Sequence, residues 1–333
     1  MFELMSPWKE HLIDFYEHKI HCGYKYEKGL IVISLFDRYY SSLNIDDLVF
    51  SRDIVEPFLY LDSNERIGTQ ISKASVLRQF GKYLFSHNVI ENIYIIPSIS
   101  RKGEAEYIPY IYSKKELTGI VNYLENYPES DFLGKYKLLP NTINAVTICI
   151  KILITTGMRL GEVLNLRTDN INLNNNIIYI DIAKNDNKRM IPISQTLTDE
   201  IRNYIVNTPF VLDNHEHLLY IDVDNRLKES NVHYYFYKAL KHNKIKRKKH
   251  GSPRIHDFRH TFAVMSLTQL QKNDGNINLS LSYLSAYLGH KSLHETQKYV
   301  WLTPILFEET KNKMADYSSF ITDIFGGDKF DED

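Results

Sequence analysis

Four short segments of the sequence concentrate side chains that bind anions, exchange protons or act as nucleophiles. An arginine guanidinium grips an anion with paired hydrogen bonds, a histidine exchanges protons near neutral pH, and a tyrosine hydroxyl can attack an electrophile. Taken alone, each segment has an ordinary explanation as a surface ion pair, a solvated helix face, a helix end or a core aromatic residue. The four segments contain, in chain order, Arg159 with Glu162, His256 with Arg259, His290 after Gly289, and Tyr299.

The order and wording of these segments carry more information than any one of them. Residues 155–166 read Thr-Thr-Gly-Met-Arg-Leu-Gly-Glu-Val-Leu-Asn-Leu, and residues 256–263 read His-Asp-Phe-Arg-His-Thr-Phe-Ala. Between them lie two β-branched runs around a polar segment that contains Lys184, and after them come Leu-Gly-His and then a tyrosine. This arrangement resembles the tyrosine recombinase (phage integrase) family over residues 110–302.

The resemblance implies a transesterification at a DNA phosphodiester. Two guanidiniums bind the non-bridging oxygens, where charge concentrates in the transition state, and donors of this kind contribute about 3–4 kcal/mol each. A tyrosine has a pKa of about 10, so its attack needs a base or strongly cationic surroundings. The implied roles are phosphate binding by Arg159 and Arg259, support of Arg159 by Glu162, nucleophilic attack by Tyr299, proton removal by His256, proton donation by Lys184 and hydrogen bonding by His290.

Two departures from the family pattern bear on these assignments. The family often has a lysine followed by a glycine in the hairpin, whereas this chain reads Lys184-Asn-Asp-Asn-Lys188. Lys188 is therefore the alternative general acid. The stretch between Arg259 and His290 is longer than usual, and we expect residues 271–276 to form an inserted turn.

The resemblance predicts a site-specific recombinase that cuts and rejoins DNA through a covalent 3′-phosphotyrosine, for integration, excision or resolution. The intermediate conserves the bond energy, so rejoining needs no ATP, metal or other cofactor. The sequence accordingly lacks a Cys-x-x-Cys, a His-Glu-x-x-His and a phosphate-binding loop. Two alternatives stay open: a type IB topoisomerase that nicks and reseals one strand, and a sequence-specific DNA-binding protein with an inactive site.

Hydrophobic spacing places these residues on a mainly helical scaffold. Apolar residues at i, i+3 and i+4 predict four or five helices within residues 7–87, and Ser113 with Glu116 forms a capping box that starts a further helix. Beta-branched runs at 176–182 and 189–193 predict a hairpin, with room for a third strand before it. The fold class is mainly α with a small β-hairpin or three-stranded sheet.

A chain of 333 residues is expected to form two domains. We predict a helical, SAM-like core DNA-binding domain over 1–96, a linker over 97–110, a mixed α/β catalytic domain over 111–303, and a C-terminal helix with an acidic tail over 304–333. The two domains would form a clamp around double-stranded DNA, and the C-terminal segment would dock on a neighbouring protomer. The resemblance thus implies a homo-tetramer on two DNA sites, with accessory or directionality proteins as further partners.

The net charge gives no hint of a DNA partner, since 40 basic residues face 41 acidic ones. The distribution does, because residues 241–260 hold eight Lys or Arg and one acid. A second basic group lies on the expected outer face of the helix at 72–87, where an ordinary solvated surface is an equal alternative. The expected DNA contacts are Lys73, Arg78, Lys82, Lys241, Lys244, Lys246, Arg247, Lys248, Lys249 and Arg254.

The sequence favours a cytoplasmic protein without a membrane partner. No apolar run approaches the about 18 residues of a membrane span, and two cysteines cannot build a disulfide framework. The abundance of Asn, Ile, Lys and Tyr is typical of an AT-rich genome, and the family context suggests a mobile element.

Overall fold

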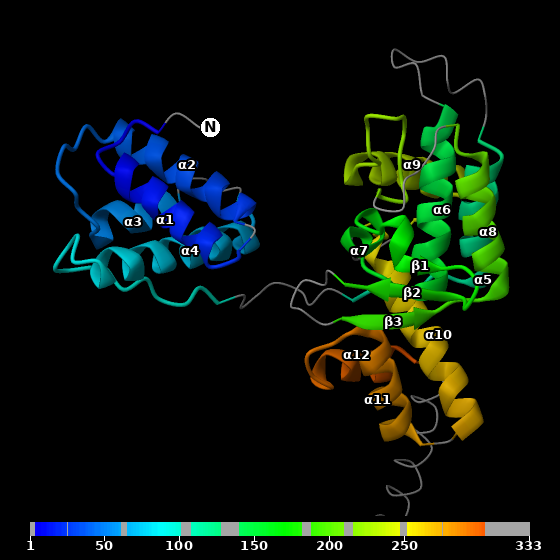
Figure 1. The fold of residues 1–333 in the computed structure, drawn as a ribbon. Helices are drawn as coiled ribbons and strands as arrows, with labels where there is room; N and C mark the ends of the chain where they lie inside the picture. Colours follow the sequence, from blue (N-terminus) through cyan, green and yellow to red (C-terminus); the bar gives the residue numbers. More distant parts are fainter. Residues whose placement is uncertain are drawn as a thin grey trace, which may run out of the picture. The chain divides into compact units, whose positions relative to one another are not determined.

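The computed structural model describes residues 4–24, 26–60, 65–100, 108–127, 140–181, 188–209, 216–246, 252–274 and 276–303. The chain divides into two compact units, Met1–Glu106 and Tyr107–Asp333 (Figure 1). Four groups of predicted residues lie outside the described ones: residues 101–107 of the predicted linker, the hairpin turn with Lys184, the basic residues Arg247, Lys248 and Lys249, and the C-terminal segment 304–333.

An aromatic core holds the first unit together. The unit's described residues form α1 (Lys9–His21), α2 (Glu27–Ser42), α3 (Arg52–Leu59) and α4 (Ile67–Ser86). Trp8 is fully buried, and the rings of Tyr40 and Phe80 meet its ring edge-on, with centroid distances of 5.9 and 5.6 Å. In such contacts the positive edge of one ring faces the negative face of the other. The helices predicted for this region are confirmed.

The prediction that Lys73 lies on an outer face of α4 is wrong. Its side chain is buried, and Nζ donates to Glu65 Oε2 at 2.7 Å and lies 5.1 Å from the centroid of the Phe58 ring. The segment before α4 and helix α3 thus cover this position. Lys73 is an internal cation paired with an acid, because a buried ammonium is tolerated only with such a partner.

The chain at 96–99 still belongs to the first unit, although the sequence predicts a linker from residue 97. Ile96 is buried in the aromatic core, and Ile99 packs against the same core. Arg78 Nε donates to the carbonyl oxygen of Ile96 at 2.9 Å and so fixes this segment on α4. Arg78 therefore has partners within its own unit, whereas Lys82 on the same helix is exposed.

A central helix, α6 (Pro140–Thr156), organises the second unit. Its apolar side chains, such as Ala145, Cys149 and Leu153, are buried because other helices pack around it. The capping box predicted at Ser113 is confirmed at the start of the helix Lys114–Glu125, since Ser113 Oγ accepts from the Glu116 backbone N–H. The surrounding helices are α5 (Lys114–Glu125), α8 (Gln195–Asn207), α9 (Glu229–His242) and α10 (His256–Asp274).

A three-stranded antiparallel sheet, in the order β1-β2-β3, borders this helical group (Figure 1). Ile178 of the middle strand pairs with both Ile171 and Ile191, which forms a buried row of β-branched side chains across the sheet. The predicted hairpin and third strand are confirmed. The elements are α7 (Leu160–Leu164), the 3₁₀ helix η2 (Thr168–Asn170), β1 (Ile171–Asn172), β2 (Ile177–Ile180) and β3 (Arg189–Pro192).

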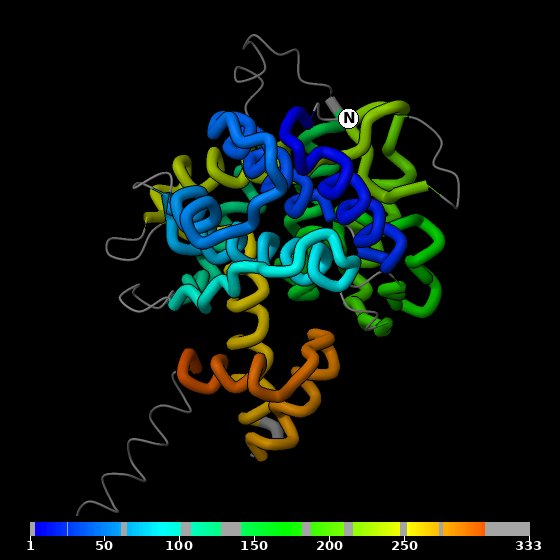
Figure 2. Tube along the Cα trace, turned by 90° about the vertical axis from the view of Figure 1, so that its left-hand side faces the viewer, coloured from blue at the N-terminus to red at the C-terminus, as the bar shows by residue number. Residues whose placement is uncertain are grey.

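Helix α10 leads from the central helices to a smaller group that it forms with α11 (Ile277–Leu288) and α12 (His294–Leu302) (Figure 2). Leu267 of α10 and Leu284 of α11 share its core. The inserted turn expected at 271–276 is wrong in its first part, because residues 271–274 continue α10. The extra length therefore extends a helix, and the side chain of Asn276 caps the next one.

Replacing Phe80 with alanine should destabilise the first unit by about 3–5 kcal/mol, because a cavity replaces ring contacts of Trp8. Urea unfolding followed by Trp8 fluorescence measures this loss in a Trp301→Phe background, since the chain has two tryptophans and Trp301 is 79% exposed. Phe85→Ala is the matched control, because Phe85 of the same helix is 56% exposed. Equal unfolding midpoints for the two variants would contradict the described core.

Candidate active site

The predicted catalytic residues that the structure describes gather where α7, α10, α11 and α12 meet. Arg159 directly precedes α7, and Arg259 lies in the first turn of α10. His290 follows the end of α11, and Tyr299 lies in α12. The charges of both arginines act on Tyr299, so residues 140 positions apart in the chain share one electrostatic environment.

Arg259 is buried and held by two backbone carbonyls. It is 3% exposed, its Nη1 donates to the carbonyl oxygen of Gly157 at 2.9 Å, and its Nη2 donates to that of Leu288 at 2.7 Å. Burial, followed by the positive charge of Arg159, lowers the pKa of Arg259 to about 10. The guanidinium therefore remains charged at neutral pH.

Gly157 presents its carbonyl to Arg259 from a conformation that favours glycine. Its φ is +62°, and a Cβ atom there would lie 2.5 Å from Cδ1 of Phe262. Both the left-handed backbone and the close ring exclude a side chain. Gly157, which lies two residues before Arg159 in the sequence, thus also holds Arg259 in place through its carbonyl.

Glu162 is a buried carboxylate shared by two arginines. Arg159 donates its backbone N–H to Oε2 at 2.9 Å and its Nη1 to Oε1 at 3.0 Å. Arg189, the first residue of β3, donates Nη1 to Oε1 at 3.1 Å and Nη2 to Oε2 at 2.8 Å. Burial alone would raise the pKa of Glu162, but the hydrogen bonds and charges of Arg189 and Arg159 outweigh it and hold the pKa below its usual range.

Tyr299 is 1% exposed and lies between aromatic and cationic groups. The His290 ring stacks on it with a centroid distance of 6.2 Å, and the His260 ring lies 5.6 Å away. Burial raises the pKa of Tyr299, and the charge and hydrogen bond of Arg259 offset only part of this increase. The hydroxyl is therefore protonated at neutral pH and must lose its proton during any attack.

His290 is fixed by a buried threonine. Its Nδ1 lies 2.7 Å from Oγ1 of Thr296, and Thr296 is fully buried in α12. Burial, followed by the charge of Arg259, lowers the pKa of His290 to about 3, so the ring is neutral. If the threonine hydroxyl donates to Nδ1, the single ring proton lies on Nε2, where it can be donated to a phosphate.

His256 and His260 lie on adjacent turns of α10, with ring centroids 4.9 Å apart. Desolvation by the surrounding protein and then the charge of Arg259 lower the pKa of His256 to about 4, although the residue is exposed to solvent. Burial and then the electrostatic effect of His256 lower the pKa of His260 to about 3. Both imidazoles are therefore neutral and able to accept a proton at pH 7.

Three residues near the site were not assigned from the sequence: His260, Lys298 and Arg189. His260 is adjacent to Arg259 in the motif, and within the described part of the chain its buried Nδ1 has no hydrogen-bond partner. Lys298 directly precedes Tyr299, and its Nζ lies 5.3 Å from the centroid of that ring. Motif adjacency was thus an available signal for the first two, whereas Arg189 had only its place at the start of a strand.

The basic residues of the second unit that are expected to contact DNA lie on the surface where they are described, in contrast to Lys73 of the first unit. Lys241, Lys244 and Lys246 are exposed at the end of α9 and just beyond it. The side chain of Arg254 is also exposed, and its Nη2 lies 3.4 Å from Oδ1 of the buried Asp257. Lys188, the alternative general acid, is exposed immediately before β3.

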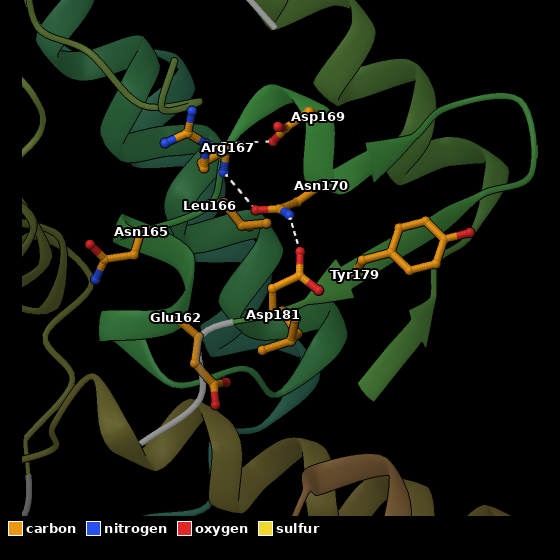
Figure 3. A pocket seen from close by; sticks show the side chains of 9 residues that line it. Glu162, Asn165, Leu166, Arg167, Asp169, Asn170, Tyr179 and Asp181 are labelled. Atoms are coloured by element: carbon orange, nitrogen blue, oxygen red, sulfur yellow. Dashed lines mark hydrogen bonds and ion pairs between the residues drawn. The ribbon is translucent and has the colours of Figure 1, made fainter. Parts of the chain in front are cut away.

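A polar pocket borders Glu162 on the side of the sheet (Figure 3). Asn170 crosses it, because its Oδ1 accepts from the Arg167 backbone N–H at 3.2 Å and its Nδ2 donates to Asp181 Oδ2 at 2.7 Å. These bonds tie η2 to the residue that follows β2, at the base of the predicted hairpin turn. The polar groups of the pocket thus hold the hairpin beside Glu162.

The described residues form neither a metal-binding cluster nor a membrane-spanning helix. Within the ranges given above, no group of three or more His, Cys, Asp or Glu is placed to hold a metal ion. None of the helices in that part of the chain is long and apolar enough to cross a membrane.

Comparison with known proteins identifies relatives of this chain. The model of the phage integrase family matches residues 116–304. The integrase/recombinase y4rB of Sinorhizobium fredii is 26% identical over 218 residues, which are 62% of this chain and 65% of that protein. Tyrosine recombinase XerC of Staphylococcus epidermidis is 25% identical over 247 residues, which are 73% of each chain.

Solved structures share the fold. Lambda integrase (residues 75–356) bound to DNA has a TM-score of 0.60 at 16% identity, with 87% of this chain and 94% of that chain covered. XerH site-specific recombinase bound to its difH substrate has a TM-score of 0.57 at 20% identity, with 81% and 74% covered. These likenesses show that the mainly helical fold with a small sheet is that of recombinases and integrases.

The imidazoles of His256, His260 and His290 should remain neutral in the free protein when the pH falls below the ordinary histidine pKa of about 6.5. Their pKa values of about 4, about 3 and about 3 place protonation at lower pH. Titration of the ring ¹³C–¹H NMR signals, assigned through single His→Gln variants, measures this. A midpoint near the ordinary value for any of the three would contradict the environment described for that histidine.

Proposed function

The chain belongs to the phage integrase family, and from the geometry of its site we propose that it is a tyrosine-type site-specific DNA recombinase. It cuts and rejoins DNA strands through a covalent 3′-phosphotyrosine, for integration, excision or resolution of DNA. The observation that supports this best is the placement of the buried Tyr299 against the ring of His290, where the charges of Arg259 and Arg159 act on its hydroxyl.

The phosphate would bind between the two arginines. Arg159 is partly exposed and is held from behind by Glu162. Arg259 uses one N–H of each Nη on a carbonyl, which leaves further N–H groups for phosphoryl oxygens. Paired guanidiniums suit the two non-bridging oxygens, and the excess positive charge of the site stabilises the additional negative charge of the transition state.

In the first step the Tyr299 oxygen attacks phosphorus and the bond from phosphorus to the 5′ oxygen breaks. The phenolic proton passes to a neutral imidazole, for which we propose His256. The ring of His260 is a neighbour of both, with centroid distances of 4.9 Å to His256 and 5.6 Å to Tyr299. Lys184 donates a proton to the departing 5′ oxygen, because an alkoxide is a poor leaving group. The products are a 3′-phosphotyrosine and a free 5′-hydroxyl.

The second step reverses the first with a different strand. A 5′-hydroxyl from the partner duplex attacks the phosphotyrosine, loses its proton to Lys184, and releases Tyr299, which regains its proton from the imidazole. Protons and bonds balance over the two steps. The phosphotyrosine retains the energy of the original bond, so this chemistry proceeds without a cofactor.

Double-stranded DNA is the proposed partner, and the two units would act as a clamp around it. The exposed residues Lys241, Lys244, Lys246 and Lys82 would neutralise phosphates, as would Arg254. We further propose a homo-tetramer on two DNA sites, docked through the segment 304–333, with accessory or directionality proteins as additional partners. A cytoplasmic location and an origin in a mobile element complete the proposal.

Tyr299→Phe should abolish a covalent protein–DNA adduct, because the variant lacks the attacking oxygen. The assay mixes the protein with nicked duplex fragments from its own genomic neighbourhood, denatures the mixture with detergent and scores a protein band shifted by DNA. Tyr283→Phe is the matched control, since Tyr283 lies on α11 and is 55% exposed. An adduct that persists in Tyr299→Phe, or is missing from wild type on every fragment, would contradict the proposed function.

Lys184→Met should slow strand cleavage about 100-fold or more, because the departing 5′ oxygen loses its proton donor. A substrate whose scissile 5′ oxygen is replaced by sulfur should restore the rate, since a thiolate leaves without a proton. Lys188→Met tests the alternative assignment under the same conditions. If the sulfur-containing substrate restores the cleavage rate of Lys188→Met while Lys184→Met still cleaves it slowly, Lys188 is the general acid.

A further inference from the structure

Arg189 makes three hydrogen bonds in the site and has no part in the chemical steps above. Its side chain is 8% exposed, and that of its partner Glu162 is 5% exposed. Two of its bonds run in parallel to Glu162, and its Nε donates to the carbonyl oxygen of Tyr287 at 3.0 Å. Arg189 thus links β3 to α7 on one side and to the end of α11 on the other.

On the α7 side, Arg189 fixes the carboxylate that holds Arg159. Arg159 binds Glu162 through one side-chain nitrogen and its backbone N–H. These two bonds alone would fix the orientation of Glu162 poorly, because the side chain of Arg159 is itself 32% exposed. The two parallel bonds from Arg189 set the plane of the carboxylate, because two such bonds form well only when the guanidinium and the carboxylate are nearly coplanar.

On the α11 side, Arg189 supports the turn that presents His290. Gly289 ends α11 with φ +65°, and a Cβ atom there would lie 3.1 Å from Cδ and Nη1 of Arg189. The guanidinium therefore passes directly against the backbone before His290. The neighbouring carbonyl of Leu288 accepts from Arg259, so two arginines hold consecutive carbonyls of this helix end.

We propose that Arg189 is a positioning residue for strand cleavage, which orients Arg159 through Glu162 and His290 through the end of α11. The inference rests on the proposed function. Its alternative is that Arg189 only stabilises the fold as half of a buried ion pair. The two roles predict different behaviour of the cleavage rate. If Arg189 positions the groups that bind the phosphate, the effect of removing Arg189 depends on the charge of the phosphate oxygens. If Arg189 only stabilises the fold, the effect does not depend on that charge.

Arg189→Met should lower the single-turnover cleavage rate about 100-fold at saturating protein, because a displaced phosphate ligand loses much of its effect. DNA affinity should fall far less, since the exposed basic residues remain. The rate is measured on a nicked duplex at a temperature below the unfolding midpoint of the variant. Arg202→Met is the matched control, because Arg202 pairs with Asp199 on the surface of α8 and should cleave at the wild-type rate.

A methylphosphonate at the scissile position separates positioning from folding. It replaces one charged non-bridging oxygen with a methyl group, so an arginine that grips that oxygen no longer contributes. For one of the two diastereomers, the deficit of Arg189→Met relative to wild type should largely disappear. A deficit of the same size on the phosphodiester and on both diastereomers would show a folding effect and overturn the inference.

Arg189→Lys keeps the result decisive if the methionine variant does not fold. Lysine retains the charge beside Glu162 but cannot form the parallel pair together with the bond to Tyr287. We expect this variant to fold and to cleave slowly, with the same dependence on the methylphosphonate. Cleavage at the wild-type rate by either folded variant would overturn the inference, whereas failure of wild type to form any adduct would instead refute the proposed function.

Discussion

The site depends on keeping more positive than negative charge in a place largely closed to water. Among its described residues, Arg159, Arg189 and Arg259 lie near the buried carboxylate of Glu162, whereas the buried carboxylate of Asp257 pairs with Arg254. A buried cation without a counter-ion is unfavourable, so it needs dipoles that stabilise it without neutralising it. Arg259 has this kind of environment: two carbonyls bind it, and its pKa of about 10 still leaves it charged at neutral pH. The remaining charge is available to an anion, and a phosphodiester is the anion that two guanidiniums fit.

This constraint explains the local backbone around the site. The carbonyls that receive the arginines belong to Gly157 and to Tyr287 and Leu288 at the end of α11. The last carbonyls of a helix have no partner within it and carry the negative end of its dipole, so they suit cations. Gly157 and Gly289, with φ of +62° and +65°, turn the chain where these carbonyls are presented. The helix end thus serves as a neutral ligand for two guanidiniums, and the residue that follows it is His290.

The same excess of charge sets the protonation of the other groups. Together with desolvation by the surrounding protein, it keeps His256, His260 and His290 neutral, so that His256 and His260 can accept a proton. It opposes burial at Tyr299 without overcoming it, so the hydroxyl keeps its proton. An entering phosphate would bring negative charge and raise the pKa of the nearby cationic acids, among them Lys298, whose pKa burial and Arg259 lower in the free site. Substrate binding and proton transfer are therefore coupled through the arginines, since the anion that they bind also changes the groups that move protons.

Features of the fold and the site that depend on residues close together in the chain can be predicted from the sequence, whereas those that depend on tertiary contacts cannot. Glu162 lies three residues from Arg159 and His256 three from Arg259, so their types and spacing were visible, as were the hairpin and the helices that place them. The polar residues at 271–274 predict a turn, although α10 continues through them. The spacing within α4 predicts an exposed Lys73, because spacing within one helix does not reveal that Phe58 and Glu65 cover this side chain. Arg189 shows the same limit in the site itself. An arginine that begins a strand is ordinary in sequence, and its meaning comes from Glu162, 27 residues before it, and Tyr287, 98 residues after it. Residues that touch a substrate can thus be found from local motifs, whereas a residue that orients them acts through tertiary contacts and is found only in the structure.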